Sequence, residues 1–322
     1  DANRFIEEVR KQPVQSLRTA SDTRNPSNLE TAGFVSRKLI RSVHKRWVAR
    51  GKAPNWFVAI RPNSGNCICD PSNFNPNDFA DVPLPAGVAG IADPFLWQVQ
   101  EKTYLLFEEL AQTDARGRLG AMEIRADGFY SEMTILLERP YHLSYPCVIR
   151  HGNDLFLMPE SSEAKCIELY RFTSFPDKVE LVEKPVEGPS LVDTTPIFID
   201  GHWYFFATTT EPFMETFLFM APNLHGPWSL HPRHSISTSV RNSRSAGQLF
   251  YRNGNLFRPT QDCSVRYGYG ITINQVTRLT PTEFEEHQVN YLPPTWRRGL
   301  LGTHTWNESA KFQVIDGYRF AQ

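Results

Sequence analysis

Several carboxylate side chains stand where runs of apolar residues begin or end. Asp93 precedes the run Pro94-Phe95-Leu96, and Glu108 and Glu109 follow the next run, which begins at Tyr104. Two such runs joined by a short polar turn predict a β-hairpin, whose outer ends meet at one edge. Carboxylates gathered there are costly unless they are solvated, paired or used. Carboxylates that take part in a reaction can give and take protons as general acids and bases.

The hairpin pattern recurs along the chain. Glu160 closes a second copy and Asp193 precedes a third, while a weaker fifth copy spans residues 302–317. The aligned positions are 52, 50 and 51 residues apart: Pro94, Pro146, Pro196 and Gly247. A period of about 50 residues with about four short strands per unit is typical of propeller blades. We therefore predict an all-β fold, a five-bladed β-propeller. In this alignment Tyr145 and Thr195 take the place of Asp93.

The composition indicates a globular chain with many strands. Of 322 residues 40% are hydrophobic, the formal net charge is −1, and Phe, Pro and Gly are abundant. This charge balance gives no indication of nucleic-acid binding. Residues 55–322 are predicted to form the propeller, and residues 1–54 a short basic, helical extension or linker. The helix expected within residues 34–50 has an apolar stripe, which could dock on the propeller or a neighbouring domain, or lie on an anionic membrane surface.

Cysteine spacing and hydropathy bear on cofactors and compartment. The five cysteines lack paired CxxC spacing for zinc, and we expect free thiols rather than a disulfide framework: Cys67, Cys69, Cys147, Cys166 and Cys263. No apolar stretch approaches the roughly 20 residues of a membrane span, and no signal-peptide pattern is present. These features favour a cytoplasmic protein with no metal ion and no cofactor.

Seven short motifs in order carry a family resemblance over residues 55–320. They are Ala-Asp-Pro-Phe-Leu at 92–96, His-Leu-Ser-Tyr-Pro at 142–146, Met-Pro-Glu-Ser at 158–161, Glu-Leu-Tyr-Arg at 168–171, Arg-Ser-Ala-Gly at 244–247, Gln-Asp-Cys at 261–263 and Gly-Thr-His-Thr-Trp-Asn at 302–307. The series resembles the sugar-enzyme-like domain of plant glucosamine inositolphosphorylceramide transferases. It also resembles bacterial relatives in which this domain follows a formyltransferase-like one. The resemblance implies a carbohydrate or glycolipid-headgroup substrate and a fused or neighbouring catalytic domain as partner.

A more distant resemblance is to five-bladed glycosidases of families 43, 32 and 68, which gather three carboxylates at the channel mouth. It implies a catalytic trio of Asp93, Glu160 and Asp193, with Glu160 as the acid. Acting on a glycosidic bond requires one carboxylic acid to protonate the leaving oxygen and one carboxylate to attack or to activate water. A third carboxylate raises the pKa of the acid by like-charge repulsion. We expect the three carboxyl groups to line one pocket.

Further polar and aromatic residues are candidates for binding the substrate. They are Glu108, Glu109, Tyr145, Arg244, Gln261, Asp262, His304, Trp306 and Asn307. Arg244 suits a carboxylate or phosphate on a sugar because its planar fork donates two parallel hydrogen bonds, whereas Trp306 or Tyr145 could stack on a sugar face. The alternatives are a buried Arg244–Asp262 ion pair and a His304 that is an ordinary core histidine.

Two classes of function stay open. One is a glycan-active enzyme, a hydrolase or transglycosylase that works through the carboxylates. The other is a non-catalytic module that binds a glycan, a sugar nucleotide or a glycolipid headgroup for a partner domain. A propeller fold alone does not decide between them.

Overall fold

The computed structural model describes residues 54–72, 74–111, 116–125 and 128–320. The basic helix expected within residues 34–50 lies outside this part of the chain. Residues Asn55–Arg319 form one compact unit. Apart from two single-turn 3-10 helices, Pro76–Asp78 and Ser162–Ala164, the regular elements of the described residues are strands.

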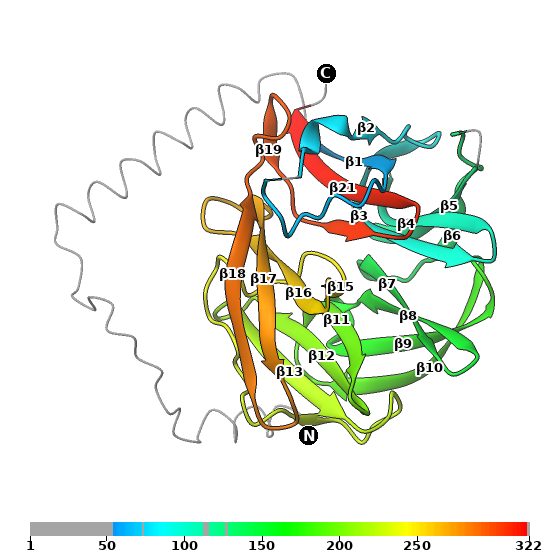
Figure 1. Cartoon of the computed structure of the whole chain (residues 1–322). Coiled ribbons are helices and arrows are strands. Elements are labelled where there is room, and N and C mark those ends of the chain that lie inside the picture. Colours follow the sequence, from blue (N-terminus) through cyan, green and yellow to red (C-terminus); the bar gives the residue numbers. More distant parts are fainter. Residues whose placement is uncertain (1–53, 73, 112–115, 126–127, 321–322) are drawn as a thin grey trace. The chain divides into compact units, whose positions relative to one another are not determined.

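The described strands form five antiparallel sheets, and each sheet is one blade of a propeller, as predicted (Figure 1). Blade 1 consists of β3 (Val88–Val99), β4 (Lys102–Ala111), β5 (Gly117–Ile124) and β6 (Thr134–Leu137). Blade 2 consists of β7 (Ser144–His151), β8 (Asp154–Glu160), β9 (Cys166–Ser174) and β10 (Lys178–Glu187). Blade 3 consists of β11 (Val192–Ile199), β12 (His202–Thr209), β13 (Glu215–Ala221) and β14 (Ser229–Leu230). Blade 4 consists of β15 (Phe250–Arg252), β16 (Asn255–Asp262), β17 (Gly270–Leu279) and β18 (Phe284–Leu292).

Blade 5 joins the two ends of the described chain. Its strands are β19 (Leu300–Gly302), β20 (Trp306–Glu308), β21 (Phe312–Phe320), β1 (Pro54–Pro62) and β2 (Ala80–Asp81). The C-terminal strand β21 lies between β19 and β1, and in Figure 1 the red β21 runs beside the blue β1. This pairing closes the ring, and it removes two free sheet edges.

A β-bulge in the first strand repeats in blades 1, 2 and 3. Its first residue has left-handed backbone angles in each blade, at Asp93 (φ 49°), Tyr145 (φ 50°) and Asp193 (φ 48°). Such angles are uncommon outside glycine and cluster at functional positions. Asp193, not Thr195, is thus the equivalent of Asp93. The sequence alignment was wrong here because it matched prolines, whereas the register shift falls between Val192 and Thr195.

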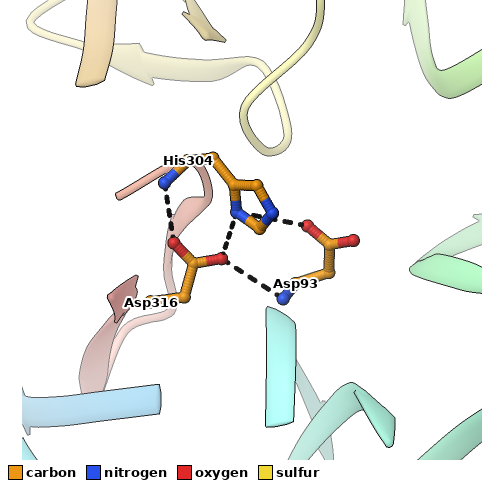
Figure 2. A group of neighbouring side chains, drawn as sticks. All are labelled: Asp93, His304 and Asp316. Atoms are coloured by element: carbon orange, nitrogen blue, oxygen red, sulfur yellow. Dashed lines mark hydrogen bonds and ion pairs between the residues drawn. The ribbon is translucent and has the colours of Figure 1, made fainter. Parts of the chain in front are cut away.

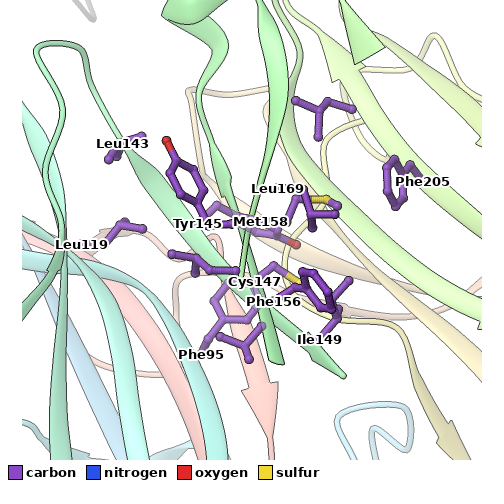
Figure 3. Packing of buried hydrophobic residues seen from close by; sticks show 14 of the residues in the cluster. Phe95, Leu119, Leu143, Tyr145, Cys147, Ile149, Phe156, Met158, Leu169 and Phe205 are labelled. Carbon is purple, nitrogen blue, oxygen red and sulfur yellow. The ribbon is translucent and has the colours of Figure 1, made fainter. Parts of the chain in front are cut away.

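The packing between blades 1, 2 and 3 is apolar and continuous (Figure 3). Phe95, Cys147 and Phe205 from three different first and second strands are at most 1% exposed. Fully burying one such large apolar side chain stabilises a fold by roughly 1.5–3 kcal/mol. This core fixes the inner strands, and with them the direction of the polar residues at their starts.

One expectation about cysteine is wrong. Cys67 and Cys69 form a disulfide with Cα atoms 5.0 Å apart, whereas Cys147, Cys166 and Cys263 are free thiols. The Cys-x-Cys spacing did not predict this disulfide, because it is not a common metal-binding or redox motif.

No membrane-spanning helix is found within the described residues, since none is both long and apolar enough.

Candidate functional site

The first strands of the blades and the ends of their partner strands bring charged residues together. Asp193 is 1% exposed and forms a two-pronged ion pair with Arg244, whose Nε donates to Oδ2 and whose Nη2 donates to Oδ1 at 3.2 Å. Gln261 Nε2 donates to the same carboxylate at 3.0 Å. Burial raises the pKa of Asp193, and the Arg244 guanidinium opposes this. Asp193 thus links blade 3 to blade 4 by charge-assisted bonds.

Glu160 reaches the same arginine from blade 2. Its Oε2 lies 3.9 Å from Arg244 Nη2 and accepts a hydrogen bond from Ser144 Oγ at 2.8 Å. Ser162 Oγ donates to Oε1 at 2.5 Å. Arg244 therefore stands between two of the predicted catalytic carboxylates. Sequence analysis had also considered Asp262 as its partner, but that residue bonds elsewhere.

Asp93 is the third predicted carboxylate, and it is 3% exposed. Thr305 Oγ1 donates to its Oδ1 at 2.5 Å. Burial raises its pKa; nearby His304 opposes the rise, while Asp193, Glu108 and Asp316 add to it, and the result is about 7. Asp193 and Glu108 act on Asp93 electrostatically, and Arg244 links Asp193 to Glu160, so these side chains form one neighbourhood.

His304 and Asp316 form a buried pair beside Asp93 (Figure 2). Nδ1 of His304 binds Asp316 Oδ2 and lies 3.8 Å from Asp93 Oδ1. Burial lowers the pKa of His304, but Asp316 and Asp93 outweigh it and raise the pKa to about 9. Asp316 also accepts backbone N–H bonds from His304 at 2.7 Å and Thr305 at 3.0 Å, which hold its carboxylate in place.

These three residues are the group within the described chain that could hold a metal ion, since their ligand atoms lie within 4.8 Å of one another. Two carboxylates and one imidazole are a donor set that a divalent metal can accept, and the same contacts can instead hold a proton on Nδ1 between the carboxylates.

Glu108 lies at the mouth with a partner of its own. His142 Nε2 is 3.2 Å from its Oε1, and Nδ1 of the same ring accepts the Gly117 N–H at 2.9 Å. Because Nδ1 accepts this hydrogen bond, Nε2 carries a ring proton, and that proton faces Glu108. A Cβ on Gly117 would lie 2.5 Å from Glu108 Oε1, so only glycine permits this approach.

Five residues that the sequence predicted to bind the substrate contact other protein groups instead: Glu109, Asp262, Asn307, Tyr145 and Trp306. Glu109 pairs with Arg118 across β4 and β5, and Asp262 accepts the Ser264 N–H at 2.8 Å in a turn. Asn307 bridges backbone groups of Pro94 and Gln248.

Tyr145 and Trp306, expected to stack on a sugar, are 0% and 1% exposed, so that expectation is wrong. Tyr145 instead links distant parts of the chain, because its hydroxyl accepts the Gly247 N–H at 2.9 Å and bonds Thr195 Oγ1 at 2.8 Å. Trp306 packs on Phe250 in the core between blades 4 and 5, with ring centroids 5.1 Å apart.

Sequence analysis missed four residues that border the site. Asp316 ends an apolar run in the last copy of the repeat, a signal that could have found it. His142 stands in the quoted motif His-Leu-Ser-Tyr-Pro. Trp56 and Tyr267 carried no local signal, since only the closure of blade 5 brings them to His304.

Comparison with known proteins places this geometry in a family. Residues 77–318 match the family model described as glucosamine inositolphosphorylceramide transferase 1, N-terminal. The chain is 31% identical over 287 residues to glucosamine inositolphosphorylceramide transferase 1 of Oryza sativa subsp. japonica, a match covering 84% of this chain and 37% of that protein. It is 29% identical over 239 residues to the protein of that name from Arabidopsis thaliana, covering 71% of this chain and 30% of the relative. The chain thus spans about a third of the length of these relatives.

Among solved structures, an α-L-arabinofuranosidase from Podospora anserina in complex with cellotriose is similar, with a TM-score of 0.52 and 9% sequence identity. The match covers 73% of this chain and 92% of that one. At this identity the likeness concerns the fold alone.

Proposed function

The chain belongs to the family of the N-terminal domain of glucosamine inositolphosphorylceramide transferase 1, and we propose that its propeller acts on a glycosidic bond at the channel mouth. The observation that carries the proposal is the gathering of Asp93, Glu160 and Asp193, from three blades, around Arg244 and His304. Buried carboxylates in such a group are expensive to maintain for stability alone.

The environments of the carboxylates assign their roles. With its pKa raised to about 7, Asp93 is half protonated near neutral pH and can give a proton to a leaving oxygen. Glu160 accepts only hydroxyl hydrogen bonds at close range and acts as the second carboxylate, attacking the anomeric carbon or activating water. Asp193 is held by Arg244 and Gln261, and its charge helps to keep Asp93 protonated. The role of the acid, which the resemblance implied for Glu160, thus passes to Asp93 in this proposal.

The names of the relatives suggest the substrate class. They are named for a transfer that involves glucosamine and inositolphosphorylceramide. For this chain we infer a glycoside, a sugar nucleotide or a glycolipid headgroup as the substrate.

A product screen by mass spectrometry tests the enzyme proposal. Wild type, Asp93→Asn and Glu160→Gln are compared on glycosides, sugar nucleotides and glycolipid headgroups, with folding checked by circular dichroism. Removing a general acid or base costs about 10²–10⁴-fold in rate, so each folded variant should lose at least about a hundredfold. The matched controls are Asp200→Asn in the β11–β12 turn and Glu101→Gln, which is 97% exposed in its side chain. Both controls should turn over substrate at the wild-type rate; equal rates in all variants would contradict the proposal.

A binding module is the second candidate, and one observation favours it. Asp193 is fully engaged by Arg244 and Gln261, as expected of a rigid recognition site. If wild type binds a panel member without converting it, the mouth presents the ligand to another domain.

A further inference from the structure

The channel mouth carries a second group of side chains, at the junction of blades 4 and 5, that the carboxylate chemistry does not use. Tyr267, in the loop between β16 and β17, leaves 48% of its surface exposed. The Arg244 guanidinium lies over its ring, 4.7 Å from the centroid. Its ring also meets those of His304 and Trp56 nearly edge-on, with centroids 5.3 Å and 6.3 Å away. Because Arg244 binds Asp193 and His304 borders Asp93, Tyr267 stands next to the carboxylates.

The His304 ring has no freedom to turn. The indole of Trp56 stacks on it with centroids 3.9 Å apart and planes inclined by 17°. Asp316 holds Nδ1, and the backbone N–H of His304 also bonds that carboxylate. Trp56 and Asp316 are therefore positioning residues, and they fix the direction in which Nε2 points.

Nε2 of His304 lacks a protein partner. The side chain is 1% exposed, yet among the described residues every hydrogen bond of its ring involves Nδ1. Because Nδ1 faces the two carboxylates, Nε2 is the ring nitrogen left to bond a ligand or an ordered water.

Arg244 offers a second donor of the same kind. Its Nε and Nη2 are used by Asp193, with Glu160 near Nη2, while Nη1 has no partner in the described part of the chain. The side chain is only 12% exposed. Two fixed cationic donors thus border one half-open aromatic ring.

We propose that Tyr267, His304 and Arg244 form a subsite for one neutral sugar ring. The apolar C–H face of the sugar packs on Tyr267, and its hydroxyl oxygens accept bonds from His304 Nε2 and Arg244 Nη1. An anionic group fits this subsite less well, because Asp193 and Glu160 already surround Arg244. The location of the glycosidic bond in this inference rests on the proposed function. The inference adds that one neutral sugar ring is held there, and that Tyr267, His304 and Arg244 hold it.

Saturation-transfer difference NMR tests whether a sugar packs on the Tyr267 ring. The probes are the methyl glycosides of glucose, galactose, xylose and arabinose, added to wild type, Tyr267→Ala and Tyr267→Phe. An aromatic contact contributes about 0.5–1.5 kcal/mol, so the Ala variant should bind up to about tenfold more weakly, while the Phe variant binds as wild type does. Tyr251→Ala is the matched control, a tyrosine of β15 that is 57% exposed in the same blade. If no probe binds wild type, or if Tyr267→Ala binds equally well, the subsite is refuted.

A pair of substitutions at His304 separates binding from structure. In His304→Asn the amide nitrogen can replace Nδ1 and keep the bond to Asp316, but the Nε2 donor is gone. In His304→Gln the amide reaches toward the position of Nε2 and the bond to Asp316 is lost. We expect the Asn variant to unfold at the higher temperature of the two and to bind the probes about tenfold more weakly than wild type does. Wild-type binding by a folded Asn variant would overturn the donor role, and if that variant fails to fold, Tyr267→Ala decides.

The two proposals can fail separately. Probe binding that depends on Tyr267, without turnover of any substrate, would refute the enzyme and support the subsite. Turnover with an unchanged KM in Tyr267→Ala would refute the subsite and support the enzyme.

Discussion

At the residue scale, the channel mouth retains charges that work against folding. Asp93 is buried among carboxylates, and its pKa of about 7 measures how strongly that environment disfavours its ionised form. A raised acid pKa contributes stability below the ordinary value of 3.8, and that contribution is lost as the pH rises through 7. The native protein should therefore lose stability between about pH 4 and pH 7 on account of this group.

Asp93→Asn removes this penalty because an amide carries no charge to desolvate. Its amide oxygen can still accept the bond from Thr305. We expect a Tm above that of wild type at pH 8 and close to it at pH 4, measured by differential scanning calorimetry. Glu101→Gln, exposed and far from Asp93 in its hairpin turn, should show no such pH-dependent gain. A lower Tm for Asp93→Asn at pH 8 would mean that the ionised carboxylate stabilises the fold.

Residue types alone could predict only part of the site. Asp93, Glu160, Asp193, Arg244, Gln261 and His304 lie near one another in the structure, and the repeat of the hairpins pointed to each of them. Glu109 failed because adjacent strand residues point to opposite faces, and Glu108 took the channel side. Trp306 failed because an aromatic residue beside polar ones looks the same in sequence whether it lines a pocket or fills a core.

At the scale of elements, the bulge in the first strand positions the site. It places Asp93, Tyr145 and Asp193 at equivalent positions with left-handed backbone angles. In blade 2 the position holds a tyrosine, which ties three blades together through Gly247 and Thr195. The bulge thus supplies a carboxylate in blades 1 and 3, and in blade 2 it supplies a tyrosine that links three blades.

Tyr145→Phe tests whether the hydrogen bonds of the Tyr145 hydroxyl stabilise the fold. Loss of the hydroxyl leaves the Gly247 N–H and the Thr195 Oγ1 without this bond in a buried place, which costs about 1–3 kcal/mol. The free energy of unfolding in urea should fall by that amount without loss of the fold. Tyr251→Phe, at an exposed position, serves as the control and should change it by less than about 0.5 kcal/mol. An unchanged free energy for Tyr145→Phe would show that water replaces the hydroxyl.

The period of the hairpins predicted the strands better than their register. The period of about 50 residues predicted the five blades, but not the shift between Val192 and Thr195. A bulge adds one unpaired residue, and nothing in the apolar pattern marks which residue that is.

At the scale of the whole propeller, closure couples the two ends of the described chain. The strand β21 completes the blade that contains β1 and β2, and it also carries Asp316 to His304. Such a ring has no independent blades, because opening it exposes two sheet edges and part of the core.

Removal of residues 312–322 should therefore abolish both the fold and the site. We expect the truncated chain to lose cooperative thermal unfolding by circular dichroism, since blade 5 loses its central strand. A control truncation after Phe320 retains β21 and should unfold as the full chain does. Cooperative unfolding near the wild-type Tm in the shorter chain would show that four blades suffice.

The central claim is that a carbohydrate binds at the channel mouth with its glycosidic bond between Asp93 and Glu160. The most direct test is a crystal structure of Asp93→Asn soaked with the glycosides of the screening panel. We predict a sugar ring against Tyr267 and a glycosidic oxygen within hydrogen-bond reach, about 3 Å, of residue 93. A sugar bound elsewhere on the propeller, or a mouth that stays free of sugar while the protein binds the glycoside in solution, would contradict the account.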